Sequence, residues 1–168
     1  MTGVVFLDRD GTLIDSEPYP HAKSRIVLVN TAGEQLQRLC KAGFRLVVVS
    51  NQSGVGRGMI SRRDVHTVQS RMLRYLKVYG VKISASFYCY HRPDEACVCR
   101  KPKPGLIEAA RQHLTLPPGP QYMIGDQPSD LIAGTAAGCK SFCVGHQTNG
   151  GPSWRAVVDE ILGEEGVE

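Results

Sequence analysis

The chain has 168 residues, of which 42% are hydrophobic and 21% are charged, and its formal net charge is +4. This length and balance are typical of one globular domain with a substantial core, and they argue against a disordered or fibrous protein. No apolar run is long enough to cross a bilayer or to form a signal-peptide core, so we expect a cytosolic protein that does not bind membranes. The positive charge is too diffuse to indicate nucleic-acid binding.

Short apolar segments alternate along the chain with segments of helical spacing. In chain order we expect a strand at Val4–Leu7, a helix at Thr31–Ala42, a strand at Arg45–Val49, a helix at Ser61–Tyr79, a short strand within Ile83–Cys89, a helix at Pro104–Leu114, a strand at Tyr122–Gly125, a helix at Pro128–Ala137, a strand at Ser141–Val144 and a helix at Trp154–Leu162. This order predicts one doubly wound (Rossmann-like) α/β domain over residues 1–168, with a parallel sheet. Residues 14–30 have little periodicity, and Pro18 and Pro20 oppose a helix there, so we predict a loop close to the mouth of the site.

Several of the expected strands end in polar residues. Asp8 and Asp10 follow the first, Ser50 follows the second and Asp126 follows the fourth. Ligands of doubly wound sheets bind beyond the carboxyl ends of the strands, so we expect the site there. Side chains two residues apart in extended chain point the same way, so Asp8 and Asp10 would converge while Arg9 turns aside. Paired carboxylates repel each other unless a cation such as Mg²⁺ lies between them, although a lone Asp-x-Asp also suits an exposed acidic turn.

A second cluster of metal-binding residue types lies within residues 89–99. It consists of Cys89, His91, Cys97 and Cys99. Three thiolates and an imidazole make a complete tetrahedral set for Zn²⁺ and leave no position for substrate, so the predicted site is structural. The alternatives are a loop of reduced cysteines beside an unrelated histidine, or a disulfide. Because Arg100 and Lys101 directly follow, zinc in this loop, which we call the zinc loop, would fix the direction of two cations.

Four motifs occur in a fixed order along residues 4–145. They are Asp8-Arg9-Asp10-Gly11-Thr12, Ser50 after a strand, Lys101 before Pro-x-Pro-Gly, and Gly125-Asp126 with the later Asp130. Together they resemble the haloacid-dehalogenase superfamily of phosphatases, whereas each alone is weak evidence. The resemblance implies hydrolysis of phosphate monoesters on a compact α/β domain without a large cap domain.

The resemblance also implies roles for the motif residues. Asp8 would be the nucleophile that forms an aspartyl phosphate, and Asp10 would act as general acid and then as general base. Ser50 and Lys101 would hold the phosphoryl oxygens. We assign this role to Lys101 rather than Lys103, because Lys101 directly precedes the Pro-x-Pro-Gly sequence.

The same resemblance implies the ligands of a catalytic Mg²⁺. They are carboxylate oxygens of Asp8 and Asp126 and the backbone carbonyl of Asp10, with waters completing the shell. Asp130 would orient Lys101 or a metal-bound water. Gln127 stands where many members of the superfamily have Lys or Arg, so its role stays open.

The zinc loop and the following Cys-Arg-Lys-Pro narrow the resemblance to a subfamily that acts on heptose bisphosphates or on histidinol phosphate. The glycine-rich loop after Ser50 is more similar to the heptose group, so we expect a small phosphorylated metabolite, a sugar bisphosphate, and a monomeric enzyme. The predicted substrate-binding residues are Asn51, Gln52, Ser53, Arg57 and Arg100. The alternatives are a phosphatase of histidinol phosphate or another small metabolite, and a zinc-containing binding module without catalysis.

Overall fold

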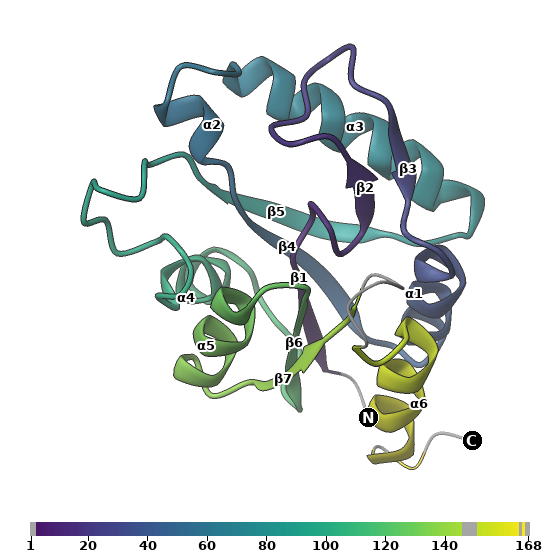
Figure 1. The fold of residues 1–168 in the computed structure, drawn as a ribbon. Helices are drawn as coiled ribbons and strands as arrows, with labels where there is room; N and C mark the ends of the chain where they lie inside the picture. Colours follow the sequence, from purple (N-terminus) through teal and green to yellow (C-terminus); the bar gives the residue numbers. More distant parts are fainter. Residues whose placement is uncertain (1–2, 146–150, 165, 167–168) are drawn as a thin grey trace.

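The computed structural model describes residues 3–145, 151–164 and 166. Its main sheet has five strands in the order β5-β4-β1-β6-β7, and every neighbouring pair is parallel (Figure 1). The strands are β1 (Val4–Leu7), β4 (Arg45–Asn51), β5 (Ile83–Cys89), β6 (Gln121–Gly125) and β7 (Lys140–Cys143). The chain runs outward from β1 on one side and then returns to the other side, which confirms the predicted doubly wound class and makes β1 the point where the strand order reverses.

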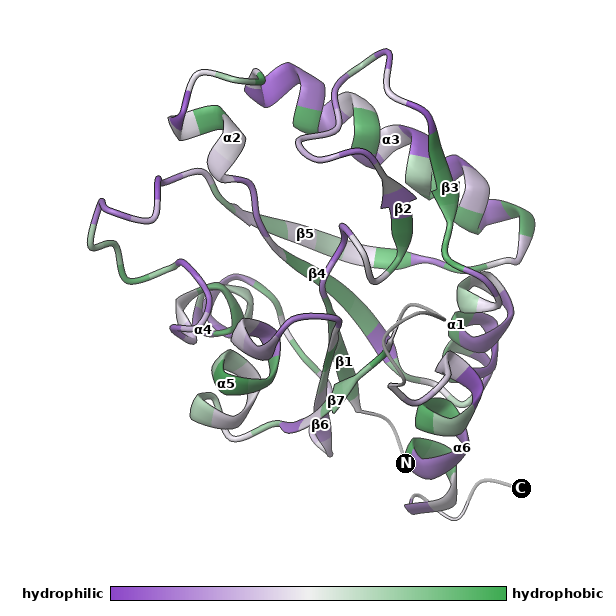
Figure 2. Ribbon diagram, in the orientation of Figure 1, coloured by the Kyte–Doolittle hydropathy of each residue, from purple (hydrophilic) through white to green (hydrophobic). Residues whose placement is uncertain are grey.

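Helices cover both faces of this sheet, as Figure 1 shows. One face carries α1 (Ala32–Lys41), α3 (Arg62–Val78) and α6 (Trp154–Glu164), and the other carries α4 (Gly105–His113) and α5 (Pro128–Ala136). Hydrophobic residues therefore concentrate in the strands and on the inward faces of the helices (Figure 2). None of the described helices combines the length and the apolarity that crossing a membrane requires.

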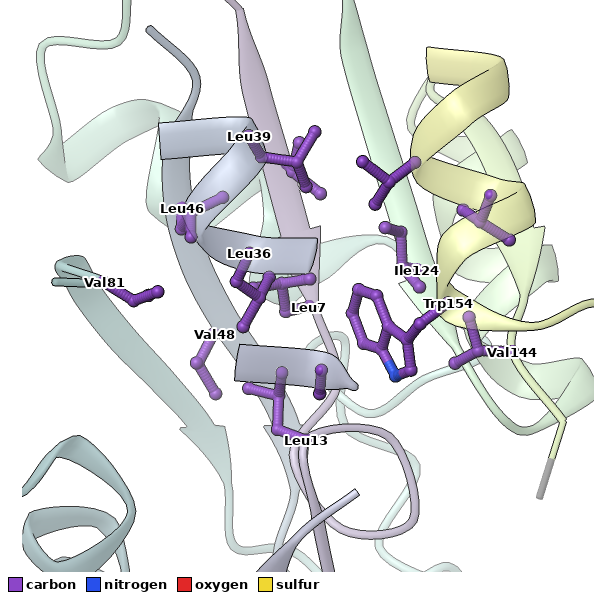
Figure 3. Packing of buried hydrophobic residues seen from close by; sticks show 14 of the residues in the cluster. Leu7, Leu13, Leu36, Leu39, Leu46, Val48, Val81, Ile124, Val144 and Trp154 are labelled. Carbon is purple, nitrogen blue, oxygen red and sulfur yellow. The ribbon is translucent and has the colours of Figure 1, made fainter. Parts of the chain in front are cut away.

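Strand β1 is buried on both faces, which explains why it is apolar throughout. Val5 and Leu7 belong to the core under α1, α3 and α6, whereas Val4 and Phe6 belong to the core under α4. Leu7 packs near Trp154 of α6 (Figure 3). Two packed faces hold the carboxyl end of β1 in a fixed position, and Asp8 follows directly from it.

Residues 14–30 differ from the predicted loop. They contain a two-stranded antiparallel hairpin of β2 (Ile14–Ser16) and β3 (Ile26–Leu28). Ile14 and Ile26 are buried, and this burial of apolar side chains stabilises strands of three residues that are too short to show a sequence period. The prolines lie in the connection between the strands, so they do not interrupt the ladder.

The other differences are small. The glycine-rich stretch after β4 forms a short helix, α2 (Ser53–Gly56), where we predicted none. Strand β4 extends to Asn51, β7 begins one residue earlier than predicted, and α6 ends two residues later. Helix α3 begins as predicted at a capping box, in which Ser61 and Asp64 each accept a hydrogen bond from the other's backbone N–H.

Candidate active site

The predicted acidic residues meet at the carboxyl ends of β1 and β6. Asp8 directly follows β1, Asp126 directly follows β6, and Asp130 lies in the first turn of α5. One carboxylate oxygen from each of the three lies within 4.8 Å of the other two. Asp8 is only 7% exposed and Asp130 only 1%. Two of these carboxylates are therefore held away from solvent, an arrangement that is unfavourable without positive charge nearby.

Lys101 supplies part of that positive charge. Its side chain is 3% exposed, and Nζ lies 2.6 Å from Oδ1 of Asp8 and 2.6 Å from Oδ1 of Asp130. Nζ also donates to the carbonyl of Val49 at 2.9 Å. The neighbouring Lys103 instead points outward and donates to a carbonyl of the zinc loop. Of the two lysines that the sequence offered, only Lys101 lies in the site.

The contacts of Lys101 change the proton affinities of this cluster. Burial raises the pKa of Asp8 to about 7, although the adjacent Lys101 ammonium works in the opposite direction. Burial also favours the neutral amine of Lys101, but Asp8 and Asp130 more than offset it, and the pKa of Lys101 lies above its usual value. The single positive charge of Lys101 does not fully balance the negative charge of the buried carboxylates. A further cation beside Asp8 would favour the ionised form of Asp8.

The carboxylate of Asp10 lies beside the cluster and is held by two neighbours. Nε and Nη2 of Arg9 donate to its two oxygens, each at 3.0 Å. Nε2 of Gln52 donates to Oδ2 at 2.6 Å and also to Oγ of Ser50 at 3.0 Å. Arg9 was expected to turn aside from the two aspartates, and this was wrong, because its buried guanidinium pairs with the carboxylate of Asp10.

Two glycines allow the carboxylates to approach the backbone. Gly11 has φ +85°, and a Cβ there would lie 2.5 Å from Oδ2 of Asp126. A Cβ on Gly125 would lie 2.3 Å from Oδ2 of Asp130. Both distances are shorter than real contacts, so any side chain at these positions would displace an aspartate. The glycines in the Asp-x-Asp-Gly and Gly-Asp motifs thus have a direct role in forming the site.

Asp126 is oriented by two residues to which the sequence analysis gave no role. Oγ1 of Thr12 donates to Oδ1 at 2.9 Å, and Nε2 of Gln127 donates to Oδ2 at 2.7 Å. Thr12 belongs to the first motif, and this membership could have indicated from the sequence that it contacts a site residue. Gln127 supplies a neutral donor at the place where the superfamily often has a cation.

An open cavity of about 630 Å³ lies in front of these groups. The carboxyl end of β4 and the segments that follow β1, β4 and β6 contribute Asp10, Gly11, Asn51, Gln52, Ser53, Asp126 and Gln127 to its lining, and the β2–β3 hairpin contributes Asp15, Glu17, Pro18, Tyr19 and Pro20. The hairpin residues were not predicted as site residues, although their segment was expected near the mouth. The hairpin therefore forms one wall of this cavity.

The predicted substrate-binding residues divide into two groups. Gln52 and Ser53 line the cavity, and so does Asn51, whose side-chain amide also bonds to both backbone groups of Lys101, at 3.0 and 3.1 Å. Arg57 and Arg100 do not line it. Arg57 is exposed at the end of α2, and Nη1 of Arg100 is buried without a hydrogen-bond partner among the described residues.

The predicted zinc ligands come together in the zinc loop. Sγ of Cys89 lies 3.2 Å from that of Cys99 and 3.7 Å from that of Cys97, and Nδ1 of His91 lies 3.5 Å from Cys89 and 3.3 Å from Cys99. Four ligands around one Zn²⁺ at about 2.0–2.3 Å stand roughly 3.3–3.8 Å apart. The separations and the donor types fit tetrahedral zinc, and the cysteines form no disulfide.

Comparison with known proteins agrees with the superfamily that the sequence motifs resemble. A family model described as HAD-hydrolase-like matches residues 98–153. The chain is similar to the D-glycero-beta-D-manno-heptose-1,7-bisphosphate 7-phosphatase of Haemophilus ducreyi, with 38% identity over 82% of this chain and 79% of that protein. The protein of the same name from Escherichia coli K12 is 35% identical over 79% of this chain and 73% of its own length.

A solved structure extends the comparison. The D,D-heptose 1,7-bisphosphate phosphatase of B. bronchiseptica, in complex with magnesium and phosphate, superimposes with a TM-score of 0.82 and 28% identity, covering 96% of this chain and 99% of that chain. The fold, the buried lysine–aspartate cluster and these relatives define the protein as a phosphatase. The chain belongs to the haloacid-dehalogenase superfamily, in the family that contains these heptose-bisphosphate phosphatases.

Proposed function

We propose that the protein is a Mg²⁺-dependent phosphatase that removes the 7-phosphate of D-glycero-D-manno-heptose 1,7-bisphosphate through an aspartyl phosphate on Asp8. The observation that carries this proposal is the contact of Lys101 with Asp8 and Asp130 at 2.6 Å each, beside Asp126. A nucleophile, a fixed cation and a further carboxylate then share one edge of the sheet. The substrate named for the relatives from H. ducreyi and E. coli supports the choice of ester.

The reaction has two steps. In the first, a carboxylate oxygen of Asp8 attacks phosphorus, and the leaving oxygen departs with the electron pair of the P–O bond and takes a proton from Asp10. In the second, water gives a proton to Asp10 and attacks phosphorus, which releases inorganic phosphate and the Asp8 carboxylate. Lys101 and the hydroxyl of Ser50 stabilise the charge on the phosphoryl oxygens in both steps.

The residues present fit a divalent cation. Carboxylates of Asp8 and Asp126, with the backbone carbonyl of Asp10, offer the hard oxygen ligands that Mg²⁺ prefers. Bound Mg²⁺ would supply positive charge between the anionic nucleophile and the anionic ester. Asp130 would orient Lys101, which it contacts directly, and the high pKa of Asp8 without another cation is consistent with this need.

The substrate's second phosphate would be bound outside the cavity by Arg57 and Arg100. Arg57 is exposed, and Arg100 is half-buried with Nη1 buried and unpaired among the described residues, so Arg57 is the more accessible of the two. Arginine suits this task because its planar guanidinium matches two phosphate oxygens. Zinc bound in the zinc loop would fix the backbone next to Arg100 and Lys101 without touching substrate.

Histidinol phosphate is the second candidate substrate, and one observation favours it. The described lining of the cavity includes the carboxylates of Asp15 and Glu17 but no lysine or arginine. An amine would be attracted to this wall, whereas a second phosphate would be repelled from it.

The deciding experiment is a phosphate-release screen with Mg²⁺. Its substrates are the heptose bisphosphate, sugar monophosphates and histidinol phosphate. A higher kcat/KM for the heptose bisphosphate supports the proposal, and a preference for histidinol phosphate supports the alternative. No phosphate release from any ester would contradict both and favour a binding module.

A further inference from the structure

We propose that Arg9 is a positioning residue that holds the carboxylate of Asp10 in the orientation required for proton transfer. This inference rests on the proposed function, because it concerns the general acid of the same site. Arg9 lies between the two aspartates of the first motif in sequence, but it is fully buried and is not part of the cavity lining, so it would act through Asp10 and not on the substrate.

The first argument is the unusual burial of a charged side chain. The side chain of Arg9 has no exposed surface, and Arg9 is one of the largest fully buried residues in the described part of the chain. A buried guanidinium costs several kcal/mol unless its N–H groups find acceptors. Nη1 donates to the carbonyl of Val65 in α3 at 3.2 Å, and the group lies 5.9 Å from the ring centre of Tyr88. These contacts hold the guanidinium in place independently of Asp10.

The second argument is the geometry at Asp10. Arg9 contacts both carboxylate oxygens at 3.0 Å, so the plane of the carboxylate follows the plane of the guanidinium. Oδ2 also accepts a short hydrogen bond from Gln52. With two donors on Oδ2 and one on Oδ1, Oδ1 keeps the freer lone pair, and we assign the proton transfer to Oδ1.

The expected consequence is specific to proton transfer. An alkoxide leaving from a sugar needs a proton as the P–O bond breaks, whereas 4-nitrophenolate is stable enough to leave without one. A defect in the orientation of Asp10 must therefore slow formation of the aspartyl phosphate, which kcat/KM reports, far more with a sugar phosphate than with 4-nitrophenyl phosphate. General destabilisation of the enzyme would slow both esters by the same factor.

The experiment uses Arg9→Lys, which keeps the charge but cannot bind two oxygens in one plane. We expect kcat/KM for the preferred sugar phosphate to fall about a hundredfold, within the usual range for general acid catalysis, and that for 4-nitrophenyl phosphate to fall less than about fivefold. If Arg9→Lys does not fold, Arg9→Gln replaces it, because it keeps a neutral donor.

The matched control is Arg111→Lys. Arg111 also makes several hydrogen bonds, to Gln121 and to the carbonyl of Ala137, but Gln121 begins β6 and so lies at the opposite end of the sheet from the site. We expect this variant to change the melting temperature without changing the ratio of kcat/KM for the two esters.

A double-mutant cycle completes the test. If Arg9 acts through Asp10, Arg9→Lys has no further effect on kcat/KM in the Asp10→Asn background, beyond about twofold. Equal losses on both esters, or multiplied losses in the double variant, would overturn the role of Arg9 while the wild-type phosphatase stays active. A wild-type protein that releases phosphate from no ester would overturn the proposed function and this inference together.

Discussion

Replacing Lys101 by Met tests the electrostatics of the site most severely. Methionine replaces the lysine side chain up to its last carbon and removes the ammonium that contacts Asp8 and Asp130 at 2.6 Å. The two carboxylates would then be buried without their cation. The change therefore affects both stability and catalysis, and the two effects can be measured separately.

The size of each effect follows from these contacts. Removing one partner of a buried ion pair costs about 3–5 kcal/mol. The pKa of Asp8 is already about 7, so a proton can replace part of the lost charge, and we expect the lower end of this range. At about 3 kcal/mol the melting temperature of a chain of this length falls by about 6–12 °C. Loss of a donor to the transition-state oxygens lowers kcat by about 10²–10³-fold.

The assays are thermal unfolding and phosphate release. Lys103→Met is the control, because Lys103 is exposed and lies outside the site, and it should keep nearly full activity. Combining Lys101→Met with Asp130→Asn removes one unpaired charge, so it should restore part of the stability and none of the activity. The reasoning is refuted if Lys101→Met keeps more than about a tenth of wild-type kcat, or if Lys103→Met loses as much as Lys101→Met.

Three further predictions concern regions around the site. Chelation of zinc should lower the melting temperature and the rate of phosphate release, and added Zn²⁺ should restore both. Full activity in protein that lacks zinc by elemental analysis would disprove the idea that zinc in this loop fixes the backbone beside Lys101. Ser61 and Ala22 donate to Asp64 and hold its pKa at about 2, so the stabilisation by this carboxylate should be complete above pH 4 and be lost as the pH falls through about 2. Asp64→Ala should therefore lower the melting temperature clearly at pH 7 and much less at pH 2. Arg57→Gln or Arg100→Gln removes one charge-assisted contact with the second phosphate, so either variant should raise KM for the heptose bisphosphate about tenfold. KM for a heptose monophosphate should stay unchanged. Equal changes for both esters would count against a second phosphate site.

The strand ends show why much of the site could be predicted from the sequence. A parallel strand that is buried on both faces must be apolar, so the first carboxylate after it marks its end and also the ligand-binding edge of the sheet. This reasoning applied to Asp8 and Asp126, and the structure brings both to one place. Lys101 was selected differently, from the resemblance to the superfamily, because it directly precedes the Pro-x-Pro-Gly sequence and Lys103 does not.

The parts that could not be predicted depend on contacts between distant segments. The β2–β3 hairpin has strands of three residues, and it is held by tertiary contacts such as the hydrogen bond from Arg71 to the carbonyl of Ser24. Such contacts leave no periodic pattern in the sequence. The direction of the Arg9 side chain was also predicted wrongly, because strand alternation applies to extended chain and Arg9 begins a turn.

The central claim is that Asp8 accepts the phosphoryl group with the help of a divalent cation. It is tested most directly by mass spectrometry of the Asp10→Asn variant, acid-quenched after mixing with 4-nitrophenyl phosphate. This donor needs no general acid to form the phosphoenzyme, whereas breakdown needs the missing base, so the intermediate should accumulate. We predict one phosphoryl group on the peptide that contains Asp8 when Mg²⁺ is present and none when it is chelated. A phosphoryl group on another residue, or equal labelling without Mg²⁺, would contradict the account.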